Sequence, residues 1–234
     1  MPPNKTTCSF AFHWTCATTG TRLFATGRID MPLAVRLDEE FGVPESMKSG
    51  NCIVRPSSGA DLDRLRNRGI HVEDAVIRPD YVKIAARAAP YLLPLARSIV
   101  AQLPPGADVR SRVAALVGLV QVVRYAVPPD CVEGRLTLGL RTPLLTLAMG
   151  EGDCDSKACL AAALLRSVSI CDVALVIGRG HALLGAAVPH RSGDAAIVMN
   201  QRNYVVTEVT TLCALGKIDR EEALAGREYT AVPS

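Results

Sequence analysis

The first thirty residues contain two short segments with the apolar and β-branched pattern of β-strands. They run from Thr7 to Thr15 and from Arg22 to Ile29, with Ala17–Gly20 between them. Two such segments joined by a short turn that contains glycine are typical of a β-hairpin. The pattern therefore predicts an antiparallel pair of strands at the start of the chain.

Helical spacing of apolar residues follows in three places. The first, Asp80 to Leu103, includes Pro90 and Pro94, which should break or kink a helix because proline lacks a backbone N–H. The second, roughly Val109 to Tyr125, ends before two consecutive prolines. The third, from about Cys154 to Val168, has apolar residues along one side, so that side is expected to be buried.

The last third of the chain predicts an antiparallel sheet. Four strand-like runs are separated by turn sequences: Val173–Ile177, His181–Val188, Ala195–Met199 and Tyr204–Thr210. Consecutive strands joined by short turns can pair as a meander. With helices first and the sheet after, the predicted fold class is α+β. We divide it into an N-terminal β-containing segment, 1–105, and a core, 106–234; within the first, residues 36–79 predict only loops and short elements.

Composition and charge narrow the possible partners. Apolar residues make up 49% of the chain. The 26 Lys and Arg residues and 23 Asp and Glu residues give a net charge of +3. This composition is that of a globular protein. The basic residues are scattered except in Asp63–Arg68, which is interpreted as a solvated helix face. No nucleic-acid partner is expected.

Nothing in the sequence predicts a membrane span. The uncharged apolar run Ala88–Ala96 is far shorter than the roughly 20 residues that a spanning helix needs. The first twenty residues also lack the basic start and long apolar stretch of a secretory signal. We expect a soluble, cytoplasmic protein without a membrane partner.

Eight cysteines stand at positions 8, 16, 52, 131, 154, 159, 171 and 213. No CxxC or CxxH pair occurs among them, so no structural zinc site and no cofactor is predicted. A chain of 234 residues does not need disulfides for stability. Most of the cysteines are therefore expected to be small buried apolar residues.

Cys154 differs from the other cysteines in its position. Asp153 can act as the N-cap of the third helix, which makes Cys154 its first residue. The free N–H groups and the dipole at that end favour a thiolate, whereas Asp153 and Asp155 oppose it. Gly150 and Gly152 allow a sharp turn into the helix and an approach to the sulfur. The placement predicts a thiol pKa below its usual value, with help from a nearby imidazolium.

A histidine and an acid follow in the order that a cysteine nucleophile needs. His181 begins a strand-like run 27 residues after Cys154, and Glu208 lies 27 residues further on, inside another such run. A charge in an apolar strand requires a partner. Asp194 is an alternative acid, although its turn sequence indicates a solvated side chain, and Asn200 is an alternative orienting residue that carries an amide.

Three segments together resemble the transglutaminase-like core of the papain-type cysteine enzymes. They are the run from Pro143 to Ala158 with its Gly-Asp-Cys, the Gly-His-Ala at residues 180–182, and Tyr204–Thr210 with its acid followed two residues later by Thr. The resemblance covers about 109–212, including the upstream helix with Tyr125. It implies that Cys154 is the nucleophile, His181 the general base and acid, and Glu208 the residue that orients the imidazole. Members of that family usually carry Asp in the last place.

These residues predict a cysteine-dependent acyl-transfer enzyme that acts on amide bonds in a peptide or protein substrate. A thioester intermediate would be resolved by water in a peptidase or amidase, the first hypothesis, or by an amine in a transglutaminase. A non-catalytic binding or assembly module with the same fold is a further alternative. A redox pair of Cys154 and Cys159 is disfavoured because five residues on one helix place the two thiols on different faces. The oligomeric state is left open.

Overall fold

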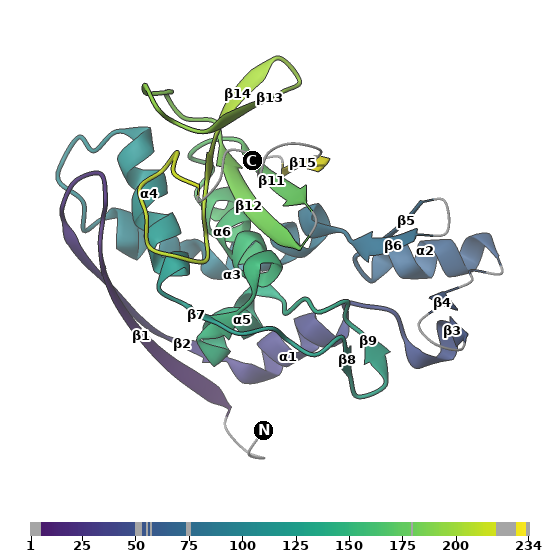
Figure 1. Cartoon of the computed structure of the whole chain (residues 1–234). Helices are drawn as coiled ribbons and strands as arrows, with labels where there is room; N and C mark the ends of the chain where they lie inside the picture. Colours follow the sequence, from purple (N-terminus) through teal and green to yellow (C-terminus); the bar gives the residue numbers. More distant parts are fainter. Residues whose placement is uncertain are drawn as a thin grey trace.

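The fold was analysed in a computed structural model of the whole chain (Figure 1). The structure describes residues 6–49, 53–54, 56, 58–73, 76–178, 180–218 and 228–232. Cys52, one of the eight cysteines considered above, and Arg179, in the turn before His181, lie outside the described residues. The described residues form a mixed α+β fold, as the sequence predicts.

The helices alternate with short strands in the first two thirds of the chain, and the longer strands lie at its two ends. The helices are α1 (Met31–Glu39), a 3-10 turn (Glu45–Met47), α2 (Gly59–Asn67), α3 (Tyr81–Val100), α4 (Val109–Gln121), α5 (Pro143–Met149) and α6 (Cys154–Ser167). The strands are β1 (Thr7–Thr15), β2 (Arg22–Asp30), β3 (Lys48–Ser49), β4 (Ile53–Val54), β5 (Ile70–Glu73), β6 (Val76–Pro79), β7 (Arg124–Tyr125), β8 (Cys131–Val132), β9 (Arg135–Leu136), β10 (Glu151–Gly152), β11 (Val173–Gly178), β12 (His181–Ala186), β13 (Ala196–Met199), β14 (Arg202–Thr207) and β15 (Glu228–Val232).

The predicted N-terminal hairpin is confirmed. Strands β1 and β2 pair antiparallel along their whole length, with Thr7 opposite Asp30 and Thr15 opposite Arg22. The hairpin lies along one side of the molecule next to α4 (Figure 1). There Trp14 is buried against Gly118, and its indole N–H donates to the carbonyl of Ala115 at 3.1 Å. The sole tryptophan of the chain therefore fixes the hairpin to the core.

Helix α3 is longer and more continuous than the prolines predict. It runs without a break from Tyr81 to Val100 and contains both Pro90 and Pro94. Each proline removes one backbone hydrogen bond, at a cost of roughly 3 kcal/mol. The apolar side of α3 packs closely on α6, and we attribute the unbroken helix to this burial, which outweighs the loss.

The predicted helix over Val109–Tyr125 is wrong at its C-terminal end. Helix α4 stops at Gln121, and Arg124 and Tyr125 form β7, which pairs in parallel with β10. The N–H of Arg124 donates to the carbonyl of Gly150 instead of to a carbonyl one turn earlier. Pairing of Arg124 and Tyr125 with β10 therefore ends the helix, upstream of Pro128 and Pro129.

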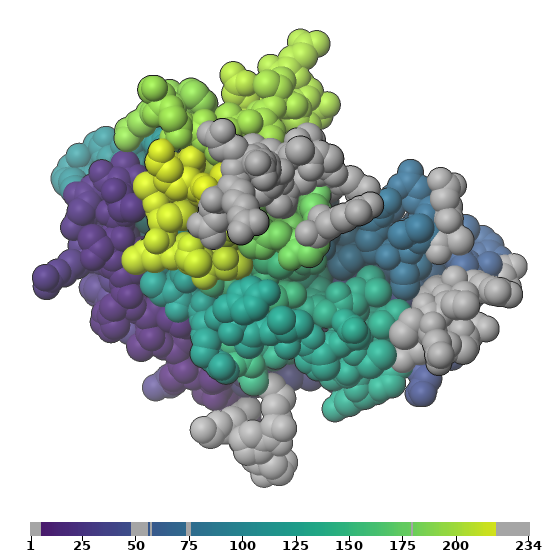
Figure 2. All heavy atoms as spheres, viewed as in Figure 1, coloured from purple at the N-terminus to yellow at the C-terminus, as the bar shows by residue number. Residues whose placement is uncertain are grey.

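The sheet contains the four predicted strands, but its order is not that of a meander. The order is β13-β14-β12-β11-β15, so β14 lies between β12 and β13, and β15 was not predicted. Strand β14 pairs with β12 through Leu184 opposite Thr207. The hairpin of β13 and β14 protrudes from the body of the molecule (Figure 2), and Val198 in it is exposed. This strand, β13, lies at the edge of the sheet outside β14, and its Ile197 is buried in a smaller hydrophobic cluster with Tyr204 and Val206.

Helix α6 forms the centre of the hydrophobic core. Every residue from Ser156 to Leu165 is buried, which extends burial around the whole helix and not only along the predicted side. The helices α3, α4 and α5 and the strands β11 and β12 cover it. Burial of each of its leucines contributes about 2 kcal/mol to the free energy of unfolding.

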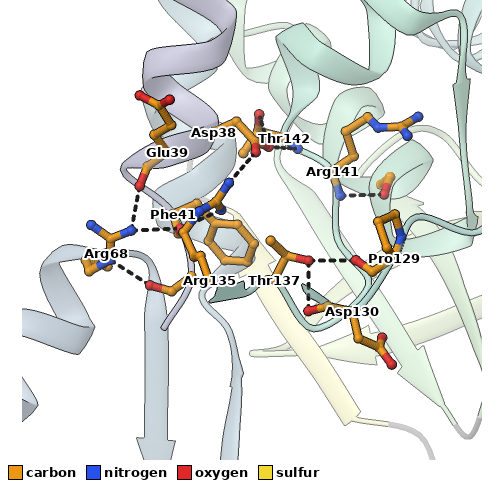
Figure 3. Close-up of polar contacts among 12 residues, drawn as sticks. Asp38, Glu39, Phe41, Arg68, Pro129, Asp130, Arg135, Thr137, Arg141 and Thr142 are labelled. Carbon is orange, nitrogen blue, oxygen red and sulfur yellow. Dashed lines mark hydrogen bonds and ion pairs between the residues drawn. The ribbon is translucent and has the colours of Figure 1, made fainter. Parts of the chain in front are cut away.

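Buried polar contacts connect the N-terminal segment to the rest of the chain (Figure 3). Arg135 donates to Asp38 in α1 at 2.8 Å, and the hydroxyl of Thr142 donates to the same carboxylate at 3.1 Å. Arg68 contacts the carbonyls of Glu39, Phe41 and Gly42. Arg68 therefore turns inward, which corrects the prediction that the run ending there is solely a solvated face.

One hydrophobic core cluster draws residues from both predicted segments. The boundary at residue 105 falls in the loop between α3 and α4, and the division at that point stays a prediction. Among the described residues, no helix is both long enough and apolar enough to cross a membrane.

The contact of Trp14 with Gly118 yields a test of the fold. A Cβ at position 118 would lie 2.5 Å from Cδ1 of the Trp14 ring. We expect Gly118→Ala to lower the free energy of unfolding by about 1 to 3 kcal/mol, because a buried ring cannot move aside without losing its packing. Urea unfolding followed by tryptophan fluorescence measures this change. Gly59→Ala, where an added Cβ meets no atom within 4 Å, is the matched control and should be nearly neutral.

Candidate active site

The turn into α6 has the geometry that the two glycines predict. Gly150 ends α5 in the left-handed region, with φ of 65°, which glycine adopts without strain. A Cβ on Gly152 would lie 3.0 Å from the side chains of Ser156 and Thr146. The carboxylate of Asp153 accepts the N–H of Ser156 at 3.0 Å and is the predicted N-cap. Cys154 is therefore the first residue of a capped helix.

The sulfur of Cys154 lies next to the start of strand β12. It is buried, with 6% of the residue exposed. The backbone N–H of Ala182 donates to it, and the thiol contacts Oδ1 of Asp155 at 3.4 Å. Ala182 follows His181 directly, so the fold brings the thiol to the neighbourhood of the predicted imidazole.

The environment of the thiol opposes the predicted thiolate. Burial and the negative charge of Asp155 raise the pKa of Cys154 to about 12, against the hydrogen bond from Ala182, which lowers it. The prediction that helix placement lowers this pKa is therefore wrong in its net direction. Cys154 is a thiol near neutral pH, and a base must remove its proton before it can attack.

Glu208 and His181 form a direct contact. Oε2 of Glu208 lies 2.7 Å from Nε2 of His181, and Glu208 is only 3% exposed. The other carboxylate oxygen, Oε1, accepts the N–H groups of Val209 and Thr210, each at 2.9 Å, and the Thr210 hydroxyl at 2.7 Å. The carboxylate is thus held in one orientation. The sequence pattern placed Glu208 inside a strand. In the structure, Glu208 lies one residue beyond the end of β14.

These contacts keep Glu208 ionised although it is buried. Burial raises the pKa of the carboxyl, but the hydrogen bonds from His181 and Thr210 outweigh it and lower the pKa to about 2. A buried carboxylate that accepts the N–H of an imidazole fixes the ring and stabilises its protonated form. Nε2 faces Glu208, which leaves Nδ1 as the other ring nitrogen of His181.

The two alternative orienting residues lie elsewhere. Asp194 pairs with Arg110 through two contacts of 2.7 and 2.8 Å, and its side chain is 5% exposed. The prediction that Asp194 is solvated is wrong, because this buried ion pair holds it. Asn200 lies in the turn between β13 and β14 with a positive φ of 50°. Of the three candidates, Glu208 is the one whose side chain contacts His181.

Sequence reasoning missed Tyr81 near the thiol, and it named Tyr125 within the resemblance without giving it a role. Tyr81 donates its hydroxyl to Oδ2 of Asp155 at 2.7 Å. Tyr125 is largely exposed, and partial burial, followed by the nearby acid groups, among them Cys154 and Asp153, raises its pKa. Nothing in the sequence pointed to the contact of Tyr81 because this residue lies 74 residues before Asp155.

A third residue that the sequence analysis passed over is Lys157, a fully buried lysine one turn after Cys154. Its charge among apolar helix positions was visible in the sequence and could have marked it.

The structure gives no support to a redox pair on α6. Cys159 is fully buried, and its thiol points toward the carbonyl of Tyr81. Burial raises the pKa of Cys159 well above its usual value. No cluster of three or more His, Cys, Asp or Glu side chains that could hold a metal ion occurs among the described residues.

The lowered pKa of Glu208 predicts a pH-dependent contribution to stability. A carboxyl with a folded pKa of about 2 and an ordinary value of 4.5 stabilises the fold fully above about pH 4.5 and loses that effect as the pH falls toward 2. The free energy of unfolding of wild type minus that of Glu208→Gln should therefore shrink by on the order of 3 kcal/mol over this range. Urea unfolding at a series of pH values measures it. A difference in the free energy of unfolding that stays constant with pH would contradict the lowered pKa of Glu208.

Comparisons with protein-family models, with curated proteins and with solved structures give no match to this chain. The site is therefore interpreted from its own chemistry. It combines a thiol at a helix N-terminus, an imidazole at the start of the neighbouring strand, and an ionised carboxylate bound to that imidazole.

Proposed function

We propose that this protein is a cysteine-dependent acyl-transfer enzyme that hydrolyses amide bonds, a peptidase or amidase with a transglutaminase-like core. The observation that carries the proposal is the 2.7 Å contact between Glu208 and His181, made beside the buried thiol of Cys154. A nucleophile, a base and a residue that orients the base are the three parts that such chemistry requires. Here they come from α6, β12 and the end of β14.

The first step is proton transfer from Cys154 to His181. The thiol is protonated at rest, so the imidazole acts as a general base through Nδ1 while Glu208 stabilises the imidazolium. The sulfur attacks the amide carbonyl and forms a tetrahedral intermediate. Backbone N–H groups in the first turn of α6 can stabilise its oxyanion.

The second step releases the amine and leaves a thioester. His181 returns the proton to the leaving nitrogen, and the C–N bond breaks as the thioester carbonyl forms. Water, deprotonated by the same imidazole, then attacks the thioester, and the acid product and the free thiol are released. An amine in place of water gives a transamidation product.

The resting thiol predicts how alkylation depends on pH. In His181→Ala, Cys154 keeps its raised pKa of about 12 without a base, so its alkylation by iodoacetamide should stay slow up to about pH 10. In wild type we expect Cys154 to react on the order of 100-fold faster near pH 7. Mass mapping of all labelled cysteines measures both rates, and Cys131, which is exposed, is the internal control. Equal rates at Cys154 in the two proteins would overturn the proposed dyad.

A second measurement separates hydrolysis from amine transfer. The protein is incubated with a mixed peptide library and a labelled primary amine, and products are identified by mass spectrometry. Hydrolysis predicts new peptide termini that are absent with Cys154→Ser. Incorporation of the amine into glutamine side chains without cleavage would show a transglutaminase instead.

A further inference from the structure

Lys157 is a buried cation that the proposed mechanism does not use. It is fully buried in α6, three residues after Cys154. Its ammonium donates to the carbonyls of Val123 at 2.7 Å, Gln121 at 3.3 Å and Thr210 at 3.3 Å. Gln121 is the last residue of α4 and Val123 follows it by two residues, while Thr210 follows Glu208 by two residues.

A buried ammonium is costly, which argues that it has a specific task. Burial lowers the pKa of Lys157 to about 8, and the negative charge of Glu208 acts in the opposite direction. An apolar residue of similar shape would avoid this desolvation. The contact of Lys157 with Thr210, whose N–H and hydroxyl bind Glu208, brings the ammonium close to the candidate active site.

A short chain of contacts connects this ammonium to the imidazole. Lys157 binds the carbonyl of Thr210, and the N–H and hydroxyl of Thr210 donate to Oε1 of Glu208. Oε2 of Glu208 in turn contacts His181. Gln121 adds a second attachment, because its side-chain amide donates to the carbonyl of Glu208 at 2.9 Å.

We propose that Lys157 is a positioning residue, which ties the helix that carries Cys154 to the Glu208–Thr210 loop and so fixes the carboxylate against His181. The inference rests on the proposed function and deepens it. Lys157 lies one turn of α6 after Cys154, and its ammonium contacts the loop that carries Glu208. It therefore couples the two halves of the site without touching a substrate.

A double-mutant cycle tests this coupling. The rate of Cys154 alkylation by iodoacetamide near pH 7 is measured in wild type, Lys157→Met, Glu208→Gln and the double variant. We expect each single change to lower the rate about tenfold or more, and the double variant to react within about twofold of Glu208→Gln. If Lys157 acted independently of Glu208, the two losses would multiply, and if it served stability alone, Lys157→Met would leave the rate unchanged in folded protein. Either result would overturn the proposal.

Arg110→Met is the matched control. Arg110 is also a buried cation replaced by methionine, but it pairs with Asp194 and lies at the opposite end of α4 from Gln121, roughly 17 Å along the helix. We expect it to lower the melting temperature while leaving the alkylation rate at Cys154 within about twofold of wild type at a temperature where both proteins are folded. A loss equal to that of Lys157→Met would show a general effect of destabilisation and overturn the proposal.

A second readout does not depend on catalysis. The proton shared by His181 and Glu208 should give a downfield signal in the proton NMR spectrum, assigned by its loss in Glu208→Gln. We expect Lys157→Met to broaden or remove it and Arg110→Met to retain it. An unchanged signal in Lys157→Met would overturn the positioning role, even if the protein proves to have no peptidase activity.

Lys157→Gln guards against a variant that fails to fold. Glutamine keeps two N–H donors without the charge. We expect Cys154 in this variant to be alkylated at a rate between those of wild type and Lys157→Met. A folded Lys157→Gln protein with wild-type rate and wild-type NMR signal would overturn the requirement for the ammonium.

Discussion

The burial of α6 on every side is the constraint on which the rest of the structure depends. A helix that is buried from Ser156 to Leu165 must be covered in all directions, and α3, α4, α5 and the strands β11 and β12 supply that cover. Two consequences follow for neighbouring elements. Helix α3 stays continuous through two prolines because it must span the length of α6, and the N-terminal hairpin is attached to α4 by Trp14. The N-terminus of α6 is one end of this covered helix, and the thiol of Cys154 lies buried there.

The same burial determines how the thiol can be used. A cysteine inside a low-dielectric site next to Asp155 is protonated, so the helix N-terminus alone does not produce a thiolate. In the proposed mechanism the proton passes to His181, whose ring contacts a carboxylate that remains charged because four donors satisfy it. Reactivity then depends on the relative placement of three elements. In our proposal, polar contacts of Lys157 and Gln121 inside the core fix that placement.

Periodicity and turn residues predicted the elements that the local sequence controls. The hairpin 7–30, helix α6 with its Asp153 cap, and the strands β11 to β14 lie where the pattern placed them. The predictions failed where a partner distant in the sequence determines the structure. Arg124 pairs with Gly150 and ends α4 early, β14 inserts between β12 and β13, and Arg110 captures Asp194. For the candidate site, the sequence indicated Cys154, His181 and Glu208, but the direction of the thiol pKa depended on burial, which no local pattern contains.

The insertion of β14 beside β12 also bears on how relatives of this chain could be found. The 26 residues between His181 and Glu208 include the β13 strand at the outer edge of the sheet, whose Ile197 packs in the smaller hydrophobic cluster and not in the main one. That excursion can lengthen or shorten in evolution without moving either side chain. The pairing of Leu184 with Thr207 cannot shift by one residue without turning the carboxylate away from the imidazole. A search that fixes the strand register and lets the spacing vary therefore suits this site better than a search for a fixed interval.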